Sequence, residues 1–228
     1  MRDAIAVSSD VYFYEIGGGY QDQVGLGITN IKKYMRIFGF GAVDVNNPLL
    51  QKAGTIPDPA WKSENFNGDP WRVGDTYNTA IGQYGFQVTP LQMVRAMSAI
   101  ANGGTLLEPT IISGDNESLT KTKNLGLSIY NIKVVQEGMR QGVTSILGTA
   151  ANLNIPDVAI AAKTGTAELG TLKKYVNSWV TGFFPYDKPR YAFAAIMEKG
   201  PSTNTVGALY VMRQLFEWMA VNTPEYLK

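Results

Sequence analysis

Four segments of the chain carry apolar residues at the spacing of one face of an α-helix. The clearest begins at Thr89, which is placed to cap a helix whose first position is Pro90, and it ends before Gly103. In an earlier segment, Thr29 or Asn30 is placed to be the cap. The pattern predicts helices over Ile28–Phe38, Thr89–Asn102, Ile129–Val143 and Ala208–Val221.

Three further stretches give weaker signals. Asp3–Glu15 mixes helix and strand residues, and it fits a helix that follows a short turn and ends at Gly17–Gly19. Residues 44–80 contain four prolines and two tryptophans, which predicts a long irregular excursion that is either functional or packed by its aromatic side chains. Residues 113–124 are polar and predict a loop.

After residue 157 the pattern changes to short apolar runs rich in β-forming residues. Val158–Lys163, Ser178–Phe184 and Tyr191–Met197 are separated by polar or proline-containing turns, which is typical of a three-stranded antiparallel meander. Helices followed by such strands indicate an α+β fold. We expect a mainly helical part over 1–157, and the meander with a C-terminal helix over 158–228.

Composition narrows the chemistry that this chain can perform. Its 228 residues are 45% hydrophobic and 17% charged, which suffices for a full core in one large domain or two small ones. The net charge is +1, so nothing indicates a nucleic-acid partner. Cysteine and histidine are both absent, which excludes disulfides, thiolate catalysis, Ser-His-Asp triads and histidine-bound metals. Acid–base chemistry near neutral pH must therefore use Lys, Asp, Glu or Tyr.

The sequence AIAAKTGTAELG places a lysine at the end of an apolar run. On a strand, Lys163 and Gly165 face one way, whereas Thr164 and Thr166 face the other. A cation, hydroxyl groups and a glycine that allows close approach to the backbone are suited to binding a carboxylate. The alternative is an ordinary strand end at which the lysine reaches solvent. A P-loop is excluded because Asp157 and Ala162 stand at the two positions where that motif requires glycine.

K-T-G accompanies S-x-x-K and S-D-N in penicillin-interacting serine enzymes. The pattern S-x-[DN] occurs four times in this chain, so alone it discriminates nothing. Only Ser8–Asp10 lies between an apolar helical segment and the aromatic run VYFY, well upstream of Lys163. The alternative for Ser8 and Asp10 is a helix cap, a common use of both residue types.

Four blocks follow one another in a specific order, namely AVSSDVYFYEIGG, GDTYNTAIGQYGFQVTPLQMVRAMSAIANGGTLLEP, AAKTGTAE and SWVTGFFP. In this order they resemble the class B penicillin-binding proteins, the monofunctional transpeptidases of bacterial cell-wall synthesis, over essentially the whole chain. The aspartate of SSD and the block PDPAWK…GDTYNTAIGQ resemble the cell-elongation subtype. The resemblance implies the penicillin-binding transpeptidase and serine β-lactamase-like fold, with this chain as the C-terminal portion of a single transpeptidase domain.

The large departure from the family concerns the nucleophile. The family's S-x-x-K motif precedes its second motif by some tens of residues, whereas the one match here, Ser118-Leu119-Thr120-Lys121, follows it inside a charged loop. A serine nucleophile needs a dry pocket in which the lysine acts as base, so we expect this match to be a solvated loop. We expect a chain that carries two of three catalytic motifs and is inactive alone. Family strands would also be missing beside Tyr191–Met197, leaving an apolar edge.

The resemblance assigns catalytic roles to three residues. Ser8 would relay a proton to the leaving amine, and Asp10 would orient Ser8 and the family's catalytic lysine. Lys163 would supply positive potential over the substrate and tune Ser8.

The resemblance assigns substrate binding to the residues that follow Lys163. Thr164 and Thr166 would bind the terminal carboxylate, and Gly165 lies between them. The backbone N–H of Thr166 would supply half of the oxyanion hole, an interaction whose loss typically costs about 10²–10³ in rate.

The activity implied is peptidoglycan D,D-transpeptidation through a serine acyl-enzyme, without metal or cofactor. The implied partners are stem peptides, β-lactam antibiotics, the missing N-terminal segment of the same domain, and proteins of the cell-elongation machinery. The implied location is the outer face of the bacterial cytoplasmic membrane, with the anchor outside this chain. Two alternatives stay open: a related serine β-lactamase or carboxypeptidase, and a non-catalytic remnant that binds cell-wall peptides or proteins.

Overall fold

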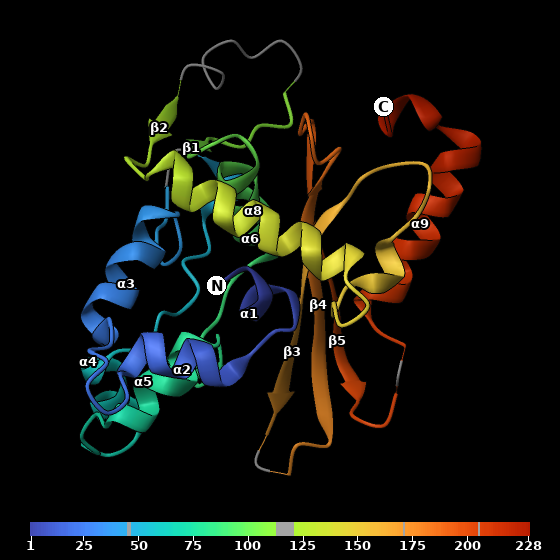
Figure 1. The fold of residues 1–228 in the computed structure, drawn as a ribbon. Coiled ribbons are helices and arrows are strands. Elements are labelled where there is room, and N and C mark those ends of the chain that lie inside the picture. Colours follow the sequence, from blue (N-terminus) through green and yellow to red (C-terminus); the bar gives the residue numbers. More distant parts are fainter. Residues whose placement is uncertain (45–46, 113–120, 171, 205) are drawn as a thin grey trace. The chain divides into compact units, whose positions relative to one another are not determined.

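The computed structural model describes residues 1–44, 47–112, 121–170, 172–204 and 206–228 (Figure 1). The described residues form two compact units. The larger unit combines Met1–Ser8 with Met93–Lys228, and the smaller unit is Ser9–Gln92.

A three-stranded antiparallel sheet lies in the larger unit. Its strands are β3 (Ala161–Leu169), β4 (Tyr175–Phe184) and β5 (Tyr191–Pro201), in the order β3-β4-β5. The predicted meander and the α+β fold class are confirmed. The second and third strands extend beyond their predicted bounds, whereas the first starts later, at Ala161 and not Val158. Polar residues such as Thr166 and Glu168 continue the pairing of β3 with β4 after the apolar run has ended.

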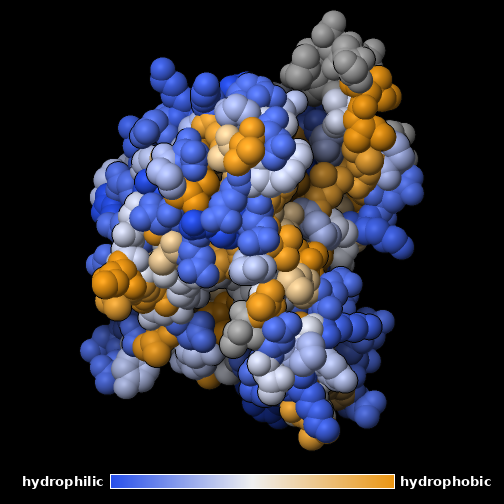
Figure 2. All heavy atoms as spheres, turned by 90° about the vertical axis from the view of Figure 1, so that its right-hand side faces the viewer, coloured by the Kyte–Doolittle hydropathy of each residue, from blue (hydrophilic) through white to orange (hydrophobic). Residues whose placement is uncertain are grey.

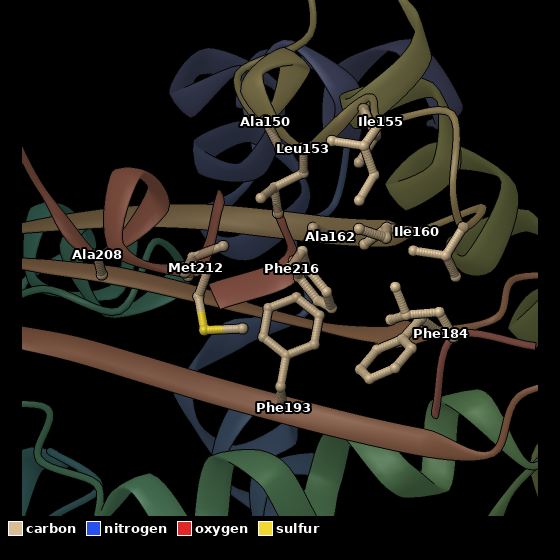
Figure 3. Close-up of a cluster of buried hydrophobic side chains, with 14 residues drawn as sticks. Ala150, Leu153, Ile155, Ile160, Ala162, Phe184, Phe193, Ala208, Met212 and Phe216 are labelled. Atoms are coloured by element: carbon tan, nitrogen blue, oxygen red, sulfur yellow. The ribbon is translucent and has the colours of Figure 1, made fainter. Parts of the chain in front are cut away.

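Helix α9 (Ala208–Asn222) covers one face of this sheet. Phe216 of α9 is fully buried, in one cluster with Val180 of β4 and Phe193 of β5 (Figure 3). The Phe216 ring lies edge-on to Phe184 and to Phe193, with 5.0 Å and 5.5 Å between ring centroids. Full burial of a phenylalanine side chain contributes about 1.5–3 kcal/mol, so this cluster holds the three strands in place.

The outer side of α9 is exposed to solvent. Figure 2 shows the side on which α9 lies in Figure 1, with hydrophobic side chains among hydrophilic ones. Val211, Leu215 and Val221 of α9 are among the exposed apolar residues. Within the described ranges, no helix is long and apolar enough to cross a bilayer.

Helices α1 (Arg2–Ala6) and α8 (Ile129–Thr144) pack on each other, and α8 also contacts β3. The contact is close at Gly142, where an added Cβ would come within 3.2 Å of the Ala162 carbonyl oxygen in β3. Arg2 and Glu137 form an ion pair across the helices. The chain segment that leads to Ser8 is thereby fixed within the same unit as β3.

One further helix begins as predicted, and the remaining described elements of the larger unit are short. In α6 (Pro90–Ala101), Thr89 Oγ1 accepts a hydrogen bond from the Gln92 N–H at 3.1 Å, and Gln92 Oε1 accepts one from the Thr89 N–H at 2.9 Å. The predicted cap is therefore confirmed, as one half of a capping box. The short elements are β1 (Thr105–Leu107), β2 (Thr122–Asn124), η2 (Ala151–Leu153) and η3 (Pro224–Tyr226). The short strand over Thr122–Asn124 corrects the loop predicted over 113–124.

Three predictions about the first 80 residues are wrong in part. Asp3–Glu15 is not one helix, because the chain breaks between α1 and α2 (Asp10–Gly18). Helix α3 (Gly27–Ile37) starts before the expected caps, and Asn30 instead donates its side-chain amide to the Leu26 carbonyl. Residues 44–80 are not irregular throughout, since they contain η1 (Pro48–Leu50), α4 (Pro59–Asn65) and α5 (Val73–Ala80).

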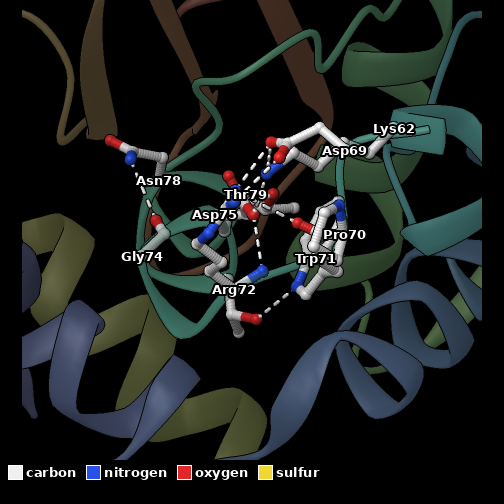
Figure 4. Close-up of polar contacts among 10 residues, drawn as sticks. Lys62, Asp69, Pro70, Trp71, Arg72, Gly74, Asp75, Asn78 and Thr79 are labelled. Atoms are coloured by element: carbon white, nitrogen blue, oxygen red, sulfur yellow. Dashed lines mark hydrogen bonds and ion pairs between the residues drawn. The ribbon is translucent and has the colours of Figure 1, made fainter. Parts of the chain in front are cut away.

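A buried lysine holds α4 and α5 together (Figure 4). Lys62 is 3% exposed, and its Nζ lies 2.7 Å from Asp75 Oδ2 and 2.8 Å from Asp69 Oδ2. The Asp75 carboxylate also accepts the backbone N–H of Arg72 at 2.6 Å. Tyr84 packs beside them, with its ring centroid 5.8 Å from Lys62 Nζ.

These contacts shift the pKa values of the charged groups. Burial alone would lower the pKa of Lys62, but hydrogen bonds with Asp69 and Asp75 outweigh it and raise that pKa. Hydrogen bonds from Arg72 and then Lys62 lower the pKa of Asp69 well below its usual range. Burial acts to raise the pKa of Asp75, yet the bonds from Lys62 and the Arg72 N–H lower it overall. The buried lysine is thus paired with two carboxylates. Trp61, Phe66, Trp71 and Tyr84 pack on one another beside it, which confirms the expectation that residues 44–80 are packed by their aromatic side chains.

Two leucines six positions apart test the core assignment. Leu153 is fully buried and Leu147 is exposed. We expect Leu153→Ala to lower the free energy of unfolding by about 2–5 kcal/mol, because Leu153 belongs to the buried cluster under α9 and its removal leaves a cavity there. Leu147→Ala should change it by less than about 0.5 kcal/mol. Urea denaturation of both variants makes the comparison, and equal effects would contradict the assignment.

The charge network makes stability depend on pH. A carboxylate whose folded pKa is lowered stabilises the protein above its unfolded pKa of about 4, and this stabilisation disappears as the pH falls through the folded pKa. We expect Asp75→Asn to cost about 1.5–3 kcal/mol at pH 7, since it removes a charged hydrogen-bond acceptor. At pH 2 the free energies of unfolding of Asp75→Asn and the unmodified chain should lie closer together, because the carboxylate is then closer to its folded pKa.

Thermal unfolding at both pH values measures this effect, and Glu64→Gln is the matched control. Glu64 lies on the exposed side of α4, so its substitution should leave the midpoint within about 2 °C at either pH. If Asp75→Asn is destabilised equally at pH 7 and pH 2, the substitution has removed packing and not charge pairing, which would contradict the prediction.

Candidate active site

Ser8 lies in the break between α1 and α2. Its φ of 55° is in the left-handed region, which is uncommon for residues other than glycine and frequent at functional sites. Its neighbour Ser9 caps α2, because Ser9 Oγ accepts the Tyr12 N–H at 3.3 Å. The capping role considered for Ser8 therefore belongs to Ser9. Asp10 is the first residue of α2, in the smaller unit.

The structure brings Lys163 and Ser8 together across the larger unit. Lys163 Nζ donates a hydrogen bond to Ser8 Oγ at 2.7 Å and another to the Thr164 carbonyl oxygen at 2.7 Å. The lysine side chain is half-buried. The alternative of an ordinary strand end, with a lysine that reaches only solvent, is therefore not what the chain adopts.

The residues of β3 alternate as predicted. Thr164 is paired with Val180, which belongs to the core under α9, so Thr164 and Thr166 share the α9 face of the sheet. Lys163 is paired with Thr181 and lies on the opposite face with Gly165.

The backbone groups of β3 also alternate, between β4 and the outer edge. The Ala161 carbonyl points at β4, where an added Cβ on Gly182 would come within 2.2 Å of it. The Thr164 carbonyl points the other way, because it accepts the bond from Lys163 Nζ. In an antiparallel strand the N–H and C=O of one residue point to the same side, and alternate residues agree. The backbone N–H of Thr166 therefore points away from β4, toward the outer edge of β3.

Gly165 is not required by the fold. An added Cβ would lie 3.5 Å from the Trp179 Cβ, which is an ordinary van der Waals contact. The backbone there is not in the left-handed region that favours glycine. The missing side chain instead leaves the exposed backbone of β3 open to close approach.

Thr149 is a site neighbour that the sequence did not indicate. The Thr164 Oγ1 and Thr149 Oγ1 atoms are 2.8 Å apart, and the Thr149 N–H donates to the Ala6 carbonyl at 3.1 Å. It lies in the turn between α8 and η2, where no apolar periodicity marks any residue. Only the folded chain places it beside β3.

We assign no role at this site to the other S-x-[DN] matches or to the S-x-x-K match. Ser63-Glu64-Asn65 forms the exposed C-terminal turn of α4. In the S-x-x-K match, Ser118, Leu119 and Thr120 lie outside the described residues, as does the match that begins at Ser113. Among the residues that the structure places, no group of three or more acidic side chains is arranged to hold a metal ion.

Comparison with known proteins places this arrangement in a family. The family described as the penicillin binding protein transpeptidase domain matches residues 1–216. The peptidoglycan D,D-transpeptidase MrdA of Acinetobacter baumannii is 30% identical over 219 residues, covering 88% of this chain and 32% of that protein. The chain thus spans about a third of the length of this curated relative.

Solved structures show the same fold. The penicillin-binding protein PBP2 of Helicobacter pylori, in a complex with MreC, is 31% identical with a TM-score of 0.76, covering 96% of this chain and 39% of that one. PBP2 of Pseudomonas aeruginosa in complex with WCK 5153 is 27% identical with a TM-score of 0.76, covering 98% and 50%. With the family match extending over 216 of its 228 residues, this chain belongs to the penicillin-binding protein transpeptidase domain family, in its PBP2/MrdA-type branch.

Proposed function

We propose that this chain is the C-terminal portion of a peptidoglycan D,D-transpeptidase domain and carries its proton relay and its carboxylate-binding strand. The observation that supports this most is the 2.7 Å hydrogen bond from Lys163 Nζ to Ser8 Oγ. A hydroxyl group has one proton to donate and two lone pairs. Because Ser8 accepts from Lys163, its own proton is left to be donated to a third group, as a relay requires.

In the proposed reaction a serine oxygen attacks the amide carbonyl carbon of a D-Ala–D-Ala stem peptide. The C–N bond breaks, and the departing D-alanine nitrogen takes up the proton that Ser8 relays. The acyl group then passes to an amine of a neighbouring strand, which restores the serine. β-Lactams acylate the same serine because they imitate the dipeptide. Asp10, at the start of α2, orients Ser8 and the catalytic lysine in this scheme.

The substrate lies along the outer edge of β3 in this proposal. The Thr166 N–H points to that edge and suits a developing oxyanion. Thr164 and Thr166 offer hydroxyl groups to the terminal carboxylate, while Lys163 supplies positive charge nearby. Gly165 permits the close approach, which fits a glycine that the fold itself does not need.

The nucleophilic serine of this reaction is not identified among these residues. Their one S-x-x-K sequence, Ser118–Lys121, follows the second motif in the wrong order. We therefore place the nucleophile outside the 228 residues, and with it the complete activity.

The PBP2/MrdA-type relationship also suggests where the whole protein works. The Helicobacter pylori relative was solved in a complex with MreC, and another similar structure belongs to a peptidoglycan synthase complex. We propose that the protein acts with cell-elongation partners of this kind, at the outer face of the bacterial cytoplasmic membrane. The membrane anchor would lie outside the residues described here.

Penicillin acylation tests the proposed function. Incubated with a labelled penicillin, the 228-residue chain alone should show no covalent mass shift. A fusion that adds, ahead of Met1, the part of Acinetobacter baumannii MrdA that precedes the matched region should be acylated. Lys163→Ala should slow this acylation about 10²-fold or more, which is a typical cost of losing a catalytic electrostatic contact. Intact-protein mass spectrometry gives the rates.

Lys174→Ala is the matched control, because Lys174 is an exposed lysine in the turn between β3 and β4. It should leave the acylation rate within about twofold. A stable adduct on the 228-residue chain alone would overturn the placement of the nucleophile. A fusion that unfolds cooperatively but is not acylated would overturn the transpeptidase proposal.

Gly165→Ala tests whether the substrate approaches β3. The new methyl group makes only an ordinary contact with Trp179, so the thermal midpoint should stay within about 2 °C. Binding of diacetyl-L-lysyl-D-alanyl-D-alanine, followed by NMR shifts of the labelled chain, should weaken about tenfold or more because the methyl group blocks the edge. Unchanged binding in a folded variant would place the ligand elsewhere.

A further inference from the structure

Thr149 connects the two chain segments that hold the candidate site. Its backbone N–H donates to the Ala6 carbonyl at 3.1 Å, two residues before Ser8, and its hydroxyl is 2.8 Å from Thr164 Oγ1. Thr149 thus bonds both to the last residue of α1 and to Thr164, which follows Lys163 in β3.

The turn that carries Thr149 is held by its own hydrogen bonds. The Ala150 N–H donates to the Gly142 carbonyl at 2.9 Å, and the Gly148 N–H donates to the Ser145 carbonyl at 2.9 Å. Ala150 is fully buried in the core under α9. The Thr149 side chain therefore rests on a rigid base, and its β-branch further restricts its rotation.

The two hydroxyl groups have a fixed hydrogen-bond capacity. Each has one proton to donate, and one of the two protons is used in the bond between Thr149 and Thr164. In the structure Thr164 Oγ1 is the donor to Thr149 Oγ1. Hydroxyl protons rotate, and when Thr149 donates instead, the O–H of Thr164 is left for another acceptor. That donor lies at the outer edge of β3, on the α9 face of the sheet.

Stability does not explain this contact. Thr149 is exposed and Thr164 is only half-buried, so each hydroxyl group can bond to water if the other is removed. Exposed contacts of this kind contribute little to folding. When Thr149 is the donor, the bond instead turns the O–H of Thr164 away from Thr149.

We propose that Thr149 is a positioning residue that donates its hydroxyl proton to Thr164 Oγ1 and so orients the Thr164 O–H toward the terminal carboxylate of the bound peptide. This inference rests on the proposed function, because it concerns the same carboxylate. Thr149 acts through Thr164, in that it aligns the donor before the substrate arrives and so reduces the cost of ordering it on binding.

Ligand binding to the 228-residue chain tests the inference. The probe is diacetyl-L-lysyl-D-alanyl-D-alanine, compared with its C-terminal amide, and NMR titration gives both Kd values. Thr149→Val removes the hydroxyl group at nearly constant shape and should weaken binding of the acid about fivefold, with binding of the amide unchanged. Thr149→Ser restores the hydroxyl group and should bring the affinity back to within about twofold.

A double-variant cycle separates positioning from other effects. Thr164→Val alone should weaken acid binding about fivefold, and adding Thr149→Val should weaken it no further, because the two hydroxyl groups act as one unit. Thermal midpoints of all variants should agree within about 2 °C.

The outcomes distinguish the two proposals. Equal acid affinities of Thr149→Val and the unmodified chain would overturn the positioning role and leave the proposed function intact. Equal losses for acid and amide, or no rescue by Thr149→Ser, would also overturn it, because a purely structural role predicts them. An unmodified chain that does not prefer the acid to the amide would overturn the carboxylate site of the proposed function, and this inference with it.

Discussion

The hydrogen bond between Lys163 Nζ and Ser8 Oγ joins residues 155 positions apart and gives the candidate site its geometry. A half-buried lysine needs an acceptor, and Ser8 provides one at the break between α1 and α2. The bond requires β3 to be rigid and the end of α1 to be fixed beside it. Packing of α8 against both α1 and β3 meets these two conditions.

The larger unit achieves this rigidity with apolar packing, whereas the smaller unit combines apolar and aromatic packing with a buried charge network. Under α9, the ring of Phe216 closes a core that holds all three strands. In the smaller unit, Lys62 is buried with Asp69 and Asp75. A paired network of this kind specifies one arrangement of short helices, because each charge is costly to bury without its partners.

Particular residues show how far sequence reasoning extends. Strand and helix positions followed from periodicity, and the alternation of Lys163 and Thr164 followed from the geometry of a strand. The prediction that 44–80 is irregular was wrong because α4 and α5 are short and are held by Lys62, a contact with no periodic pattern, whereas the expected packing by aromatic side chains is confirmed. The break at Ser8 was missed for a similar reason: Ser8 adopts a left-handed φ, which no apolar pattern indicates.

The sequence by itself determined the α+β class, the order of the motifs and the family to which they point. These are local properties, since hydrophobic spacing and short motifs depend on neighbouring residues. Only the tertiary structure decided that Lys163 meets Ser8, that Ser9 and not Ser8 caps α2, and that Thr149 stands beside Thr164. Those contacts depend on how α8 and the turn after it pack against β3, and packing between distant segments leaves no periodic trace in the chain.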